Sequence, residues 1–160
     1  LFHGVDFSLA AIMTDNSEVK ASMLARGPAA LASQPFSALI GTRLSKWSAD
    51  EVELELEISD KIRQQHGFVH GGVVAYMADN ALTFAGAAKL AGTAIVTGEM
   101  KINYIRPAVG EKLIARATAI SGGSTQSVAR CEVYCLIDGV EKLCAAAQGT
   151  INKLPERGEK

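Results

Sequence analysis

The sequence has few cysteines and no excess of positive charge, and each shortage excludes a class of protein. Cys131, Cys135 and Cys144 are the three cysteines among 160 residues. An odd number of cysteines without a C-x-x-C pair argues against a disulfide framework and against a zinc site. We therefore expect the three cysteines to be buried and to pack as small apolar residues. A net charge of −1 provides no basic surface for a nucleic acid, so we expect no nucleic-acid partner.

Long apolar runs and targeting signals are also missing. The most apolar stretch, residues 71–90, is interrupted by Asp79, Asn80, Thr83 and Lys89. A buried core helix therefore explains it better than a membrane span, and we expect no membrane partner. The first residues lack the basic segment that opens a secretory signal. These observations predict a cytoplasmic protein.

The length of the chain, 160 residues, suits a single domain with a sizeable core. We divide it into an N-terminal extension (1–33), a folded domain (34–154) and a C-terminal tail (155–160). The extension is expected to be partly helical, with a short helix over 17–25 that Gly27-Pro28 ends.

The spacing of apolar residues predicts an α+β fold. Residues 51–58, "EVELELEI", alternate between charged and apolar, which is typical of a half-buried strand. A helix of about five turns is predicted from about Gly71 to Gly92. Four further strands are predicted at 94–108, 111–120, 127–137 and 140–151, the last two joined by a type I′ turn at Asp138-Gly139. Since the helix is apolar on all sides, a curved sheet or a second subunit must cover the side away from the sheet.

Asp79 stands out because a carboxylate in so apolar a helix is costly unless it is paired or hydrogen-bonded. Helical spacing places it on one stripe with Gly72, Tyr76 and Thr83. In one interpretation Thr83 and nearby backbone simply satisfy the carboxylate. In the other it is catalytic, because the glycines at the start of the helix leave free N–H groups that resemble an oxyanion hole.

A donor at Gly71 and a carboxylate at Asp79 suggest acyl transfer or hydrolysis, but they lie about 12 Å apart on one helix at 1.5 Å per residue. One thioester or ester cannot reach both. We therefore expect the carboxylate to come from a second copy of the helix, packed antiparallel in a symmetric dimer with two equivalent sites.

Other catalytic and metal motifs are absent. His66 and His70 form H-x-x-x-H without the Glu of a zinc protease, so we predict no metal site. His70 is expected to cap or support the turn, and a general-base role is the second interpretation. No G-x-S-x-G elbow or recognisable cysteine nucleophile is present.

Two stretches carry a resemblance to a known family: "QQHGFVHGGVVAYMADNALTFAG" at 64–86 and "INYIRPAVGEKLIARA" at 102–117. They resemble the hotdog-fold acyl-CoA thioesterases of the phenylacetyl-CoA thioesterase type, related to one group of 4-hydroxybenzoyl-CoA thioesterases. The likeness runs from about Phe36 to Leu154. It implies a hotdog fold, in which a curved antiparallel sheet wraps a long central helix, and a homodimer or homotetramer with active sites between subunits.

The resemblance also implies roles for individual residues. Gly71 would donate its N–H to the thioester oxygen, and Asp79 of the partner subunit would be the nucleophile or general base. Gln64 would hold the thioester or the water, and Thr83 would assist the attacking water. Contacts with the substrate or coenzyme A are implied for Thr97, Tyr104, Arg106, Pro107, Ser121, Gly122, Gly123, Ser124 and Thr125.

The expected function is hydrolysis of an acyl-CoA thioester to a free acid and coenzyme A without a cofactor. The alternatives are a non-catalytic acyl-CoA-binding module, a hotdog hydratase and an interaction domain in which Asp79 is only structural. The hairpin "SGGSTQS" lacks the Lys or Arg of many relatives, so Arg106 and the Gly122-Gly123 backbone are the candidate phosphate contacts. Tyr76, Phe84 and Met100 are candidates for an acyl pocket that suits an aryl or alkyl group equally.

Overall fold

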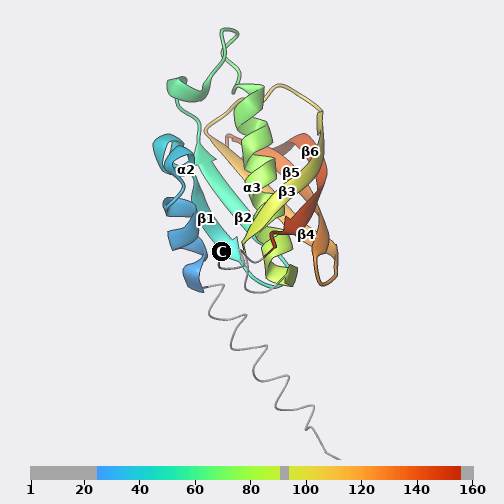
Figure 1. Ribbon diagram of the computed structural model, residues 1–160. Helices are drawn as coiled ribbons and strands as arrows, with labels where there is room; N and C mark the ends of the chain where they lie inside the picture. The colour runs from blue at the N-terminus through green and yellow to red at the C-terminus, as the bar shows by residue number, and fades with distance from the viewer. Residues whose placement is uncertain (1–24, 91–93, 156–160) are drawn as a thin grey trace, which may run out of the picture.

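The computed structural model describes residues 25–90 and 94–155 (Figure 1). Residues 25–32 are helical. The remaining elements are α2 (Pro35–Ile40), β1 (Arg43–Trp47), β2 (Val52–Glu57), the short 3₁₀ helix η1 (Asp60–Ile62), α3 (Gly71–Leu90), β3 (Ile95–Tyr104), β4 (Lys112–Gly122), β5 (Gln126–Ile137) and β6 (Val140–Lys153).

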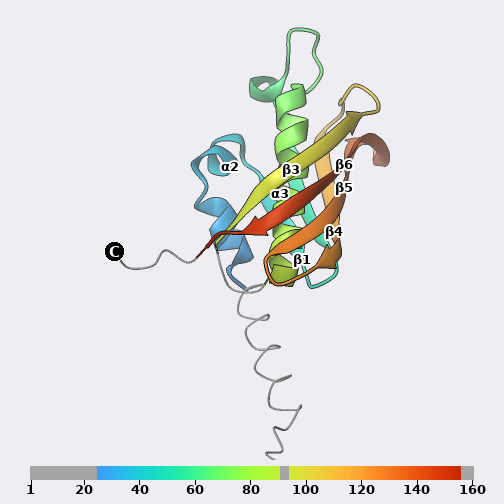
Figure 2. The same ribbon diagram turned by 45° about the vertical axis from the view of Figure 1, so that its right-hand side comes forward.

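The six strands form one antiparallel sheet in the order β1-β2-β4-β5-β6-β3. The sheet curls around α3, with β1 and β2 on one side of the helix and β3 on the other (Figures 1 and 2). Strands β2 to β6 all contact α3. The α+β arrangement with a central helix wrapped by a curved sheet is therefore confirmed. Among the described helices, none has both the length and the apolar character of a membrane span.

The core lies between α3 and the concave face of the sheet. Met77, Ala78, Ala81 and Leu82 of α3 are fully buried. On β5 alternate residues from Ala129 to Cys135 are buried, which is the period-two pattern of a strand with one face on the core. The three cysteines are free and buried, and burial raises the pKa of Cys131 to about 12, so it behaves as an apolar core residue.

Gly86 allows α3 to approach β6 closely. A Cβ atom at this position would lie 2.6 Å from Cγ1 of Ile151, which is closer than side-chain atoms can pack. The glycine therefore sets the distance between helix and sheet, and with it the position of the residues earlier on α3.

The turn between β5 and β6 has the predicted conformation. Both Asp138 and Gly139 have positive φ, 49° and 74° respectively, as a type I′ turn requires. The turn fixes the register of the two longest strands of the sheet.

The N-terminal segment differs from the sequence-based expectation. Residues 25–32 form a helix that continues through Gly27 and Pro28, so the predicted stop at this pair is wrong. Leu31 is buried in the core, and the bare backbone of Gly27 lies against the ring of Trp47. This packing outweighs the poor helix propensity of the two residues. Most of the helix expected over 17–25 lies outside the described residues, as does Gly92.

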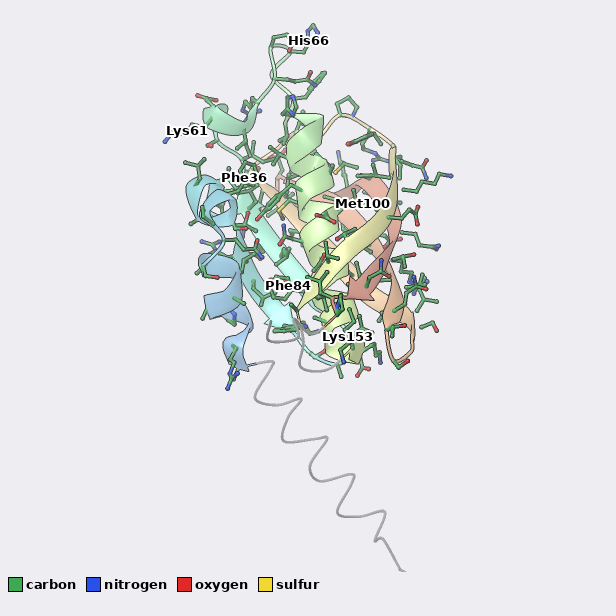
Figure 3. The ribbon with its side chains drawn as sticks, viewed as in Figure 1. Phe36, Lys61, His66, Phe84, Met100 and Lys153 are labelled. Carbon is green, nitrogen blue, oxygen red and sulfur yellow. The ribbon has the colours of Figure 1, made fainter. Side chains whose placement is uncertain are left out.

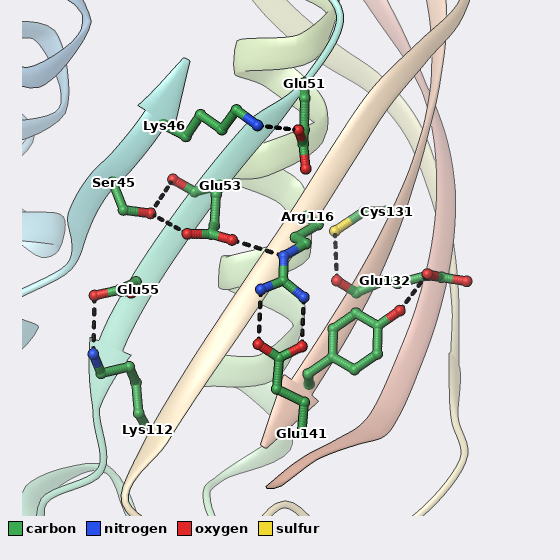
Figure 4. Close-up of polar contacts among 11 residues, drawn as sticks. Ser45, Lys46, Glu51, Glu53, Glu55, Lys112, Arg116, Cys131, Glu132 and Glu141 are labelled. Carbon is green, nitrogen blue, oxygen red and sulfur yellow. Dashed lines mark hydrogen bonds and ion pairs between the residues drawn. The ribbon is translucent and has the colours of Figure 1, made fainter. Parts of the chain in front are cut away.

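Ion pairs cover the outer face of the sheet (Figure 4). Arg116 of β4 donates to Glu53 of β2 and, through both terminal nitrogens, to Glu141 of β6. Lys112 donates to Glu55 at 3.0 Å. These contacts join β2, β4 and β6 on the side away from α3.

Candidate active site

His70 caps the N-terminus of α3, as expected. Its Nδ1 accepts a hydrogen bond of 3.0 Å from the N–H of Gly72, and its carbonyl accepts one of 2.9 Å from the N–H of Val73. Since Nδ1 is an acceptor, the proton of the neutral ring sits on Nε2. Among the described residues, the N–H of Gly71 has no acceptor. One donor of the first turn is therefore free, at the positive end of the helix dipole.

A pocket of about 550 Å³ lies at this end of α3, and Gly71 is one of its lining residues. Its polar lining comes from Gln64, Gly71, Tyr104 and Arg106. The Tyr104 hydroxyl donates a hydrogen bond of 3.1 Å to the carbonyl of Gly71, which fixes its ring beside the glycine. The apolar lining includes Phe68, Val69, Val74, Ile105, Pro107, Ala108 and Cys144. The structure thus brings five of the predicted site residues into one pocket: the four polar ones and Pro107.

The loop before α3 presents Gln64 to the pocket. The Gln64 N–H donates to Phe68 at 2.8 Å, and the Gln64 carbonyl accepts from Gly67 at 2.9 Å. Gly67 has a φ of 80°, which other residues rarely adopt. These two hydrogen bonds hold the backbone of Gln64 in the tight loop, and Gln64 lines the pocket from there. His66 lies at the exposed tip, away from α3 (Figure 3).

The loop after β3 forms the other wall of the pocket. The carbonyl of Cys144 accepts from the N–H groups of Ile105 and Arg106, at 2.8 and 3.3 Å. The neighbouring Cys135 and burial raise the pKa of the Cys144 thiol. Cys144 therefore keeps its proton where it lines the pocket.

Asp79 belongs to a separate cluster with two threonines. The Thr97 hydroxyl donates a hydrogen bond of 2.7 Å to Oδ1 of Asp79. The Thr83 hydroxyl donates to the Asp79 carbonyl, not to its carboxylate, and lies 2.9 Å from the Thr97 oxygen. All three residues are half-buried. A bulge at Gly98, where the register of β3 shifts between Thr97 and Glu99, marks the point at which the strand delivers Thr97 to α3.

The two threonines have two hydroxyl hydrogens for three contacts. A bond to an ionised carboxylate is the strongest of the three, so Thr97 gives its hydrogen to Asp79. Thr83 then shares its hydrogen between the Asp79 carbonyl and Thr97. Among the described residues, Oδ2 of Asp79 accepts no hydrogen bond. One carboxylate oxygen is held in place and the other is available.

The cluster and the pocket are not contiguous in one chain. Asp79, Thr83 and Thr97 do not line the pocket at Gly71, and Gly71 lies about 12 Å from Asp79 along α3. In a single chain, Gly71 and the Asp79 cluster therefore lie at two separate places on the same helix.

The residues expected to contact coenzyme A fall at two ends of α3. Tyr104, Arg106 and Pro107 line the pocket at its N-terminus. The hairpin from Ser121 to Thr125 lies at its C-terminal end (Figure 1), where Gly122 packs against Lys89.

The sequence analysis missed two lysines beside this hairpin. Lys89 lies against Gly122, and the backbone N–H of Lys153 donates to the carbonyl of Thr125 at 2.8 Å. Both come from other elements, α3 and β6. Only the fold reveals that they stand next to a hairpin that has no basic residue of its own.

The three apolar candidates for an acyl pocket have different surroundings. Phe84 is buried and packs edge-on against Trp47, with ring centroids 5.0 Å apart, so it belongs to the core. Tyr76 and Met100 are half-buried. Tyr76 packs against Phe36 of α2, whereas Met100 lies on β3. Among residues 25–90 and 94–155, no group of three or more His, Cys, Asp or Glu is arranged to hold a metal ion.

Comparison with known proteins identifies the family. The family model described as "Thioesterase superfamily" matches residues 66–142. A thioesterase family protein from Silicibacter pomeroyi has a similar solved structure, with a TM-score of 0.73, 30% identity, and coverage of 87% of this chain and 98% of that chain. A predicted esterase from Saccharolobus solfataricus is 31% identical over 111 residues, 69% of this chain and 72% of that protein.

A third relative is a 1,4-dihydroxy-2-naphthoyl-CoA hydrolase from Listeria monocytogenes, 27% identical over 113 residues, which cover 70% of this chain and 89% of that protein. The matched residues 66–142 include the helix cap, Gly71, Asp79 and the β4–β5 hairpin. The chain belongs to the thioesterase superfamily and is a thioester hydrolase with the hotdog fold.

Proposed function

We propose that the protein hydrolyses acyl-CoA thioesters to a free acid and coenzyme A. The relative from Listeria monocytogenes, whose name specifies a CoA thioester, supports this substrate class. The pocket at the start of α3 supports it as well, because its apolar walls suit the pantetheine arm and Arg106 adds a positive charge at its edge.

Gly71 acts as the oxyanion donor. Its N–H is the unpaired donor of the first turn of α3, because His70 occupies the N–H of Gly72. Such a group stabilises the negative charge that develops on the thioester oxygen when the carbonyl carbon is attacked. Gln64 and the Nε2 proton of His70 are further donors for the thioester or the water.

Asp79 supplies the catalytic carboxylate. As a general base, it takes a proton from the water that attacks the carbonyl carbon, the C–S bond breaks, and that proton passes to the leaving thiolate of coenzyme A. As a nucleophile, it forms an acyl-aspartyl anhydride as the C–S bond breaks, and water then hydrolyses the anhydride to the free acid and protonates the thiolate. Thr97 holds one carboxylate oxygen, which leaves the other for this task. Thr83 is placed to hold the water beside Thr97. The reaction needs only water and these groups, so we propose no cofactor.

The complete site is formed between two subunits. The Gly71 half-site and the Asp79 half-site of one chain are too far apart for one thioester, whereas antiparallel packing of two α3 helices would bring Gly71 of one subunit to Asp79 of the other. The edge position of β3 supports this arrangement, because within the described residues it pairs with β6 alone. Its open edge can pair with β3 of a second copy.

Such a dimer also brings the C-terminal end of one α3 towards the N-terminal end of the other. The hairpin from Ser121 to Thr125 would then approach the partner's pocket. Lys89 and Lys153, together with Arg106, would provide the positive charge for the coenzyme A phosphates that the hairpin itself lacks.

The observation that carries the proposal is the free N–H of Gly71 in a pocket, combined with an Asp79 carboxylate held at one oxygen. The test is thiol release from acetyl-, hexanoyl- and phenylacetyl-CoA by the wild type and by Asp79→Asn, with Asp50→Asn in the exposed β1–β2 turn as the control. We expect Asp79→Asn to lower kcat by at least about 100-fold, as for loss of a general base, and Asp50→Asn to leave it unchanged.

Two results would contradict the proposal. Binding of acyl-CoA without turnover by the wild type would identify a binding module. Turnover that survives in Asp79→Asn would make Asp79 a structural residue.

A further inference from the structure

Helix α2 carries its apolar and polar residues on unexpected sides. Its buried residue is Ser37, whereas Phe36 is 50% exposed and Leu39 is 78% exposed. A surface helix normally buries its apolar side chains, so a buried serine beside exposed large apolar residues calls for a reason. The short helix is held to the domain by the hydrogen bond at Ser37 and by Ile40, which packs against the core.

The hydrogen bond at Ser37 leads to Tyr76 on α3. The Tyr76 hydroxyl donates to Ser37 at 2.5 Å, and the Ser37 hydroxyl donates to the side-chain carbonyl of Gln34 at 2.6 Å. Phe36 packs against the Tyr76 ring in an edge-to-face arrangement, with ring centroids 5.0 Å apart. The Tyr76 ring is thus fixed at its hydroxyl and supported on one side by a second ring.

Tyr76 precedes Asp79 by three residues, about 4.5 Å along the same helix. Asp79 therefore lies between two chemically different flanks. On the β3 side, Thr83 and Thr97 provide hydroxyl groups. On the α2 side, Tyr76 and Phe36 provide an aromatic surface. Figure 3 shows Phe36 between α2 and α3, on the side of the helix opposite to Met100.

Hydrolysis of an acyl-CoA needs a polar place for the water and an apolar place for the acyl group beside the same carboxylate. The threonine flank meets the first need. We propose that Phe36 is a specificity-determining residue, which together with Tyr76 forms the wall that receives the acyl group. The protein then favours acyl groups with an aromatic ring or a medium-length chain over acetyl. This inference rests on the proposed role of Asp79 at the reacting carbon.

The wall explains why Phe36 remains half exposed. An apolar ring that was needed only for the fold would be buried, whereas a ring that contacts substrate stays open until the acyl group covers it. An acetyl group has a single methyl group to place against the wall, so it gains little apolar contact from the ring.

The test compares kcat and KM of the wild type, Phe36→Ala and Leu39→Ala on phenylacetyl-CoA and acetyl-CoA. Phe36→Ala is expected to lower kcat/KM for phenylacetyl-CoA by about 10-fold, mainly through KM, the scale set by lost apolar contacts in a pocket. The effect on acetyl-CoA should be less than about twofold. Leu39→Ala is the matched control, because Leu39 is on the same helix but lines a separate hollow with Ser59 and Ile62. Phe36→Leu should restore part of the preference.

Equal losses on both substrates, or no loss on phenylacetyl-CoA, would overturn the inference. Light scattering of the Phe36→Ala protein gives a second check, because a change in oligomeric mass would make Phe36 an interface residue and not a substrate contact. If the wild type hydrolyses neither thioester, the proposed function fails.

In that case the role of Phe36 is tested by binding alone. The affinities of the wild type and Phe36→Ala for two non-hydrolysable ketones, phenacyl-CoA and acetonyl-CoA, are compared. Selective weakening of phenacyl-CoA by Phe36→Ala supports the wall. If the wild type and Phe36→Ala bind phenacyl-CoA with equal affinity, or if the wild type does not bind it, the proposed wall is refuted.

Discussion

The Thr97 hydroxyl donates a hydrogen bond of 2.7 Å to Oδ1 of Asp79 and so joins the edge strand β3 to the middle of α3. The bond fixes the carboxylate in one rotamer. The resemblance assigned Thr97 a substrate contact, whereas its hydrogen is already committed to Asp79. We therefore propose that Thr97 positions this carboxylate, in addition to the substrate contact that the resemblance implies.

Replacement of Thr97 by valine tests this role, because valine keeps the branched shape and removes the hydroxyl. We expect kcat on phenylacetyl-CoA to fall by about 10- to 150-fold with little change in KM, since a hydrogen bond to a charged group contributes about 1.5–3 kcal/mol. Thr97→Ser keeps the hydroxyl and should retain most of the activity. If the serine variant loses as much as the valine variant, packing rather than the hydrogen bond is the cause.

Gly71→Pro tests the proposed oxyanion donor with little disturbance of the helix. Proline is well tolerated at the first position of a helix, and it removes only the N–H that already lacks an acceptor. We expect kcat to fall by about 100-fold or more, the loss typical of one oxyanion donor. The melting temperature should stay close to that of the wild type.

Gly71→Ala is the control for the added side-chain atoms. A Cβ here would lie 3.7 Å from the Tyr104 ring, an ordinary contact, and the N–H is kept. Alanine should therefore retain far more kcat than proline. Similar losses in the two variants would indicate a blocked pocket instead of a missing donor.

Mixed dimers test whether the site is shared between subunits. If Gly71 of one chain acts with Asp79 of the other, a dimer of one Gly71→Pro chain and one Asp79→Asn chain has one site with both defects and one site with neither. Two differently tagged chains, co-expressed and purified through both tags, should regain about half the wild-type activity per dimer. Both homodimers should remain inactive, and a mixed dimer that is equally inactive would place the two residues in one subunit's site.

Periodicity alone predicted most of the fold, because the strong patterns in this chain come from burial on one face. The alternation in β2 and β5 and the Asp138-Gly139 turn have local causes, and all three match the structure. α2 was missed because it is short and buries a serine, so it has no apolar stripe to detect. The helix through Gly27 and Pro28 was missed because it is stabilised by tertiary packing. Its Leu31 is buried in the core, and its Gly27 lies against Trp47 of β1.

In the candidate site, too, the features with a local cause were predicted and those that depend on contacts between distant elements were not. The cap by His70 followed from its place before two glycines. The pairing of Asp79 with Thr97 could not be found by helical spacing, which pointed to Thr83, because the partner comes from β3 through a bulge. Lys89 reaches the β4–β5 hairpin only after the sheet has curled around α3. Contacts between distant elements require the fold itself.

Ion pairs on the outer face predict how stability depends on pH. The hydrogen bond from Arg116 holds the pKa of Glu141 below its usual value of 4.5, and Lys112 does the same for Glu55. A carboxylate whose folded pKa is lowered stabilises the protein fully above its unfolded pKa, and this contribution is lost as the pH falls through the folded pKa. The free energy of unfolding should therefore decrease as the pH is lowered from about 4.5, in urea titrations between pH 7 and pH 3.

Arg116→Gln should destabilise the protein at pH 7 by about 0.5–1 kcal/mol, because the pairs are partly open to water. The difference from wild type should shrink as the pH falls through the lowered folded pKa of Glu141, because protonation removes the charge that Arg116 binds. Arg43→Gln removes the charge of a more exposed pair, so it should lower the free energy of unfolding by less. If Arg116→Gln lowers the free energy of unfolding equally at pH 7 and pH 3, Arg116 stabilises the sheet by packing and not by its charge.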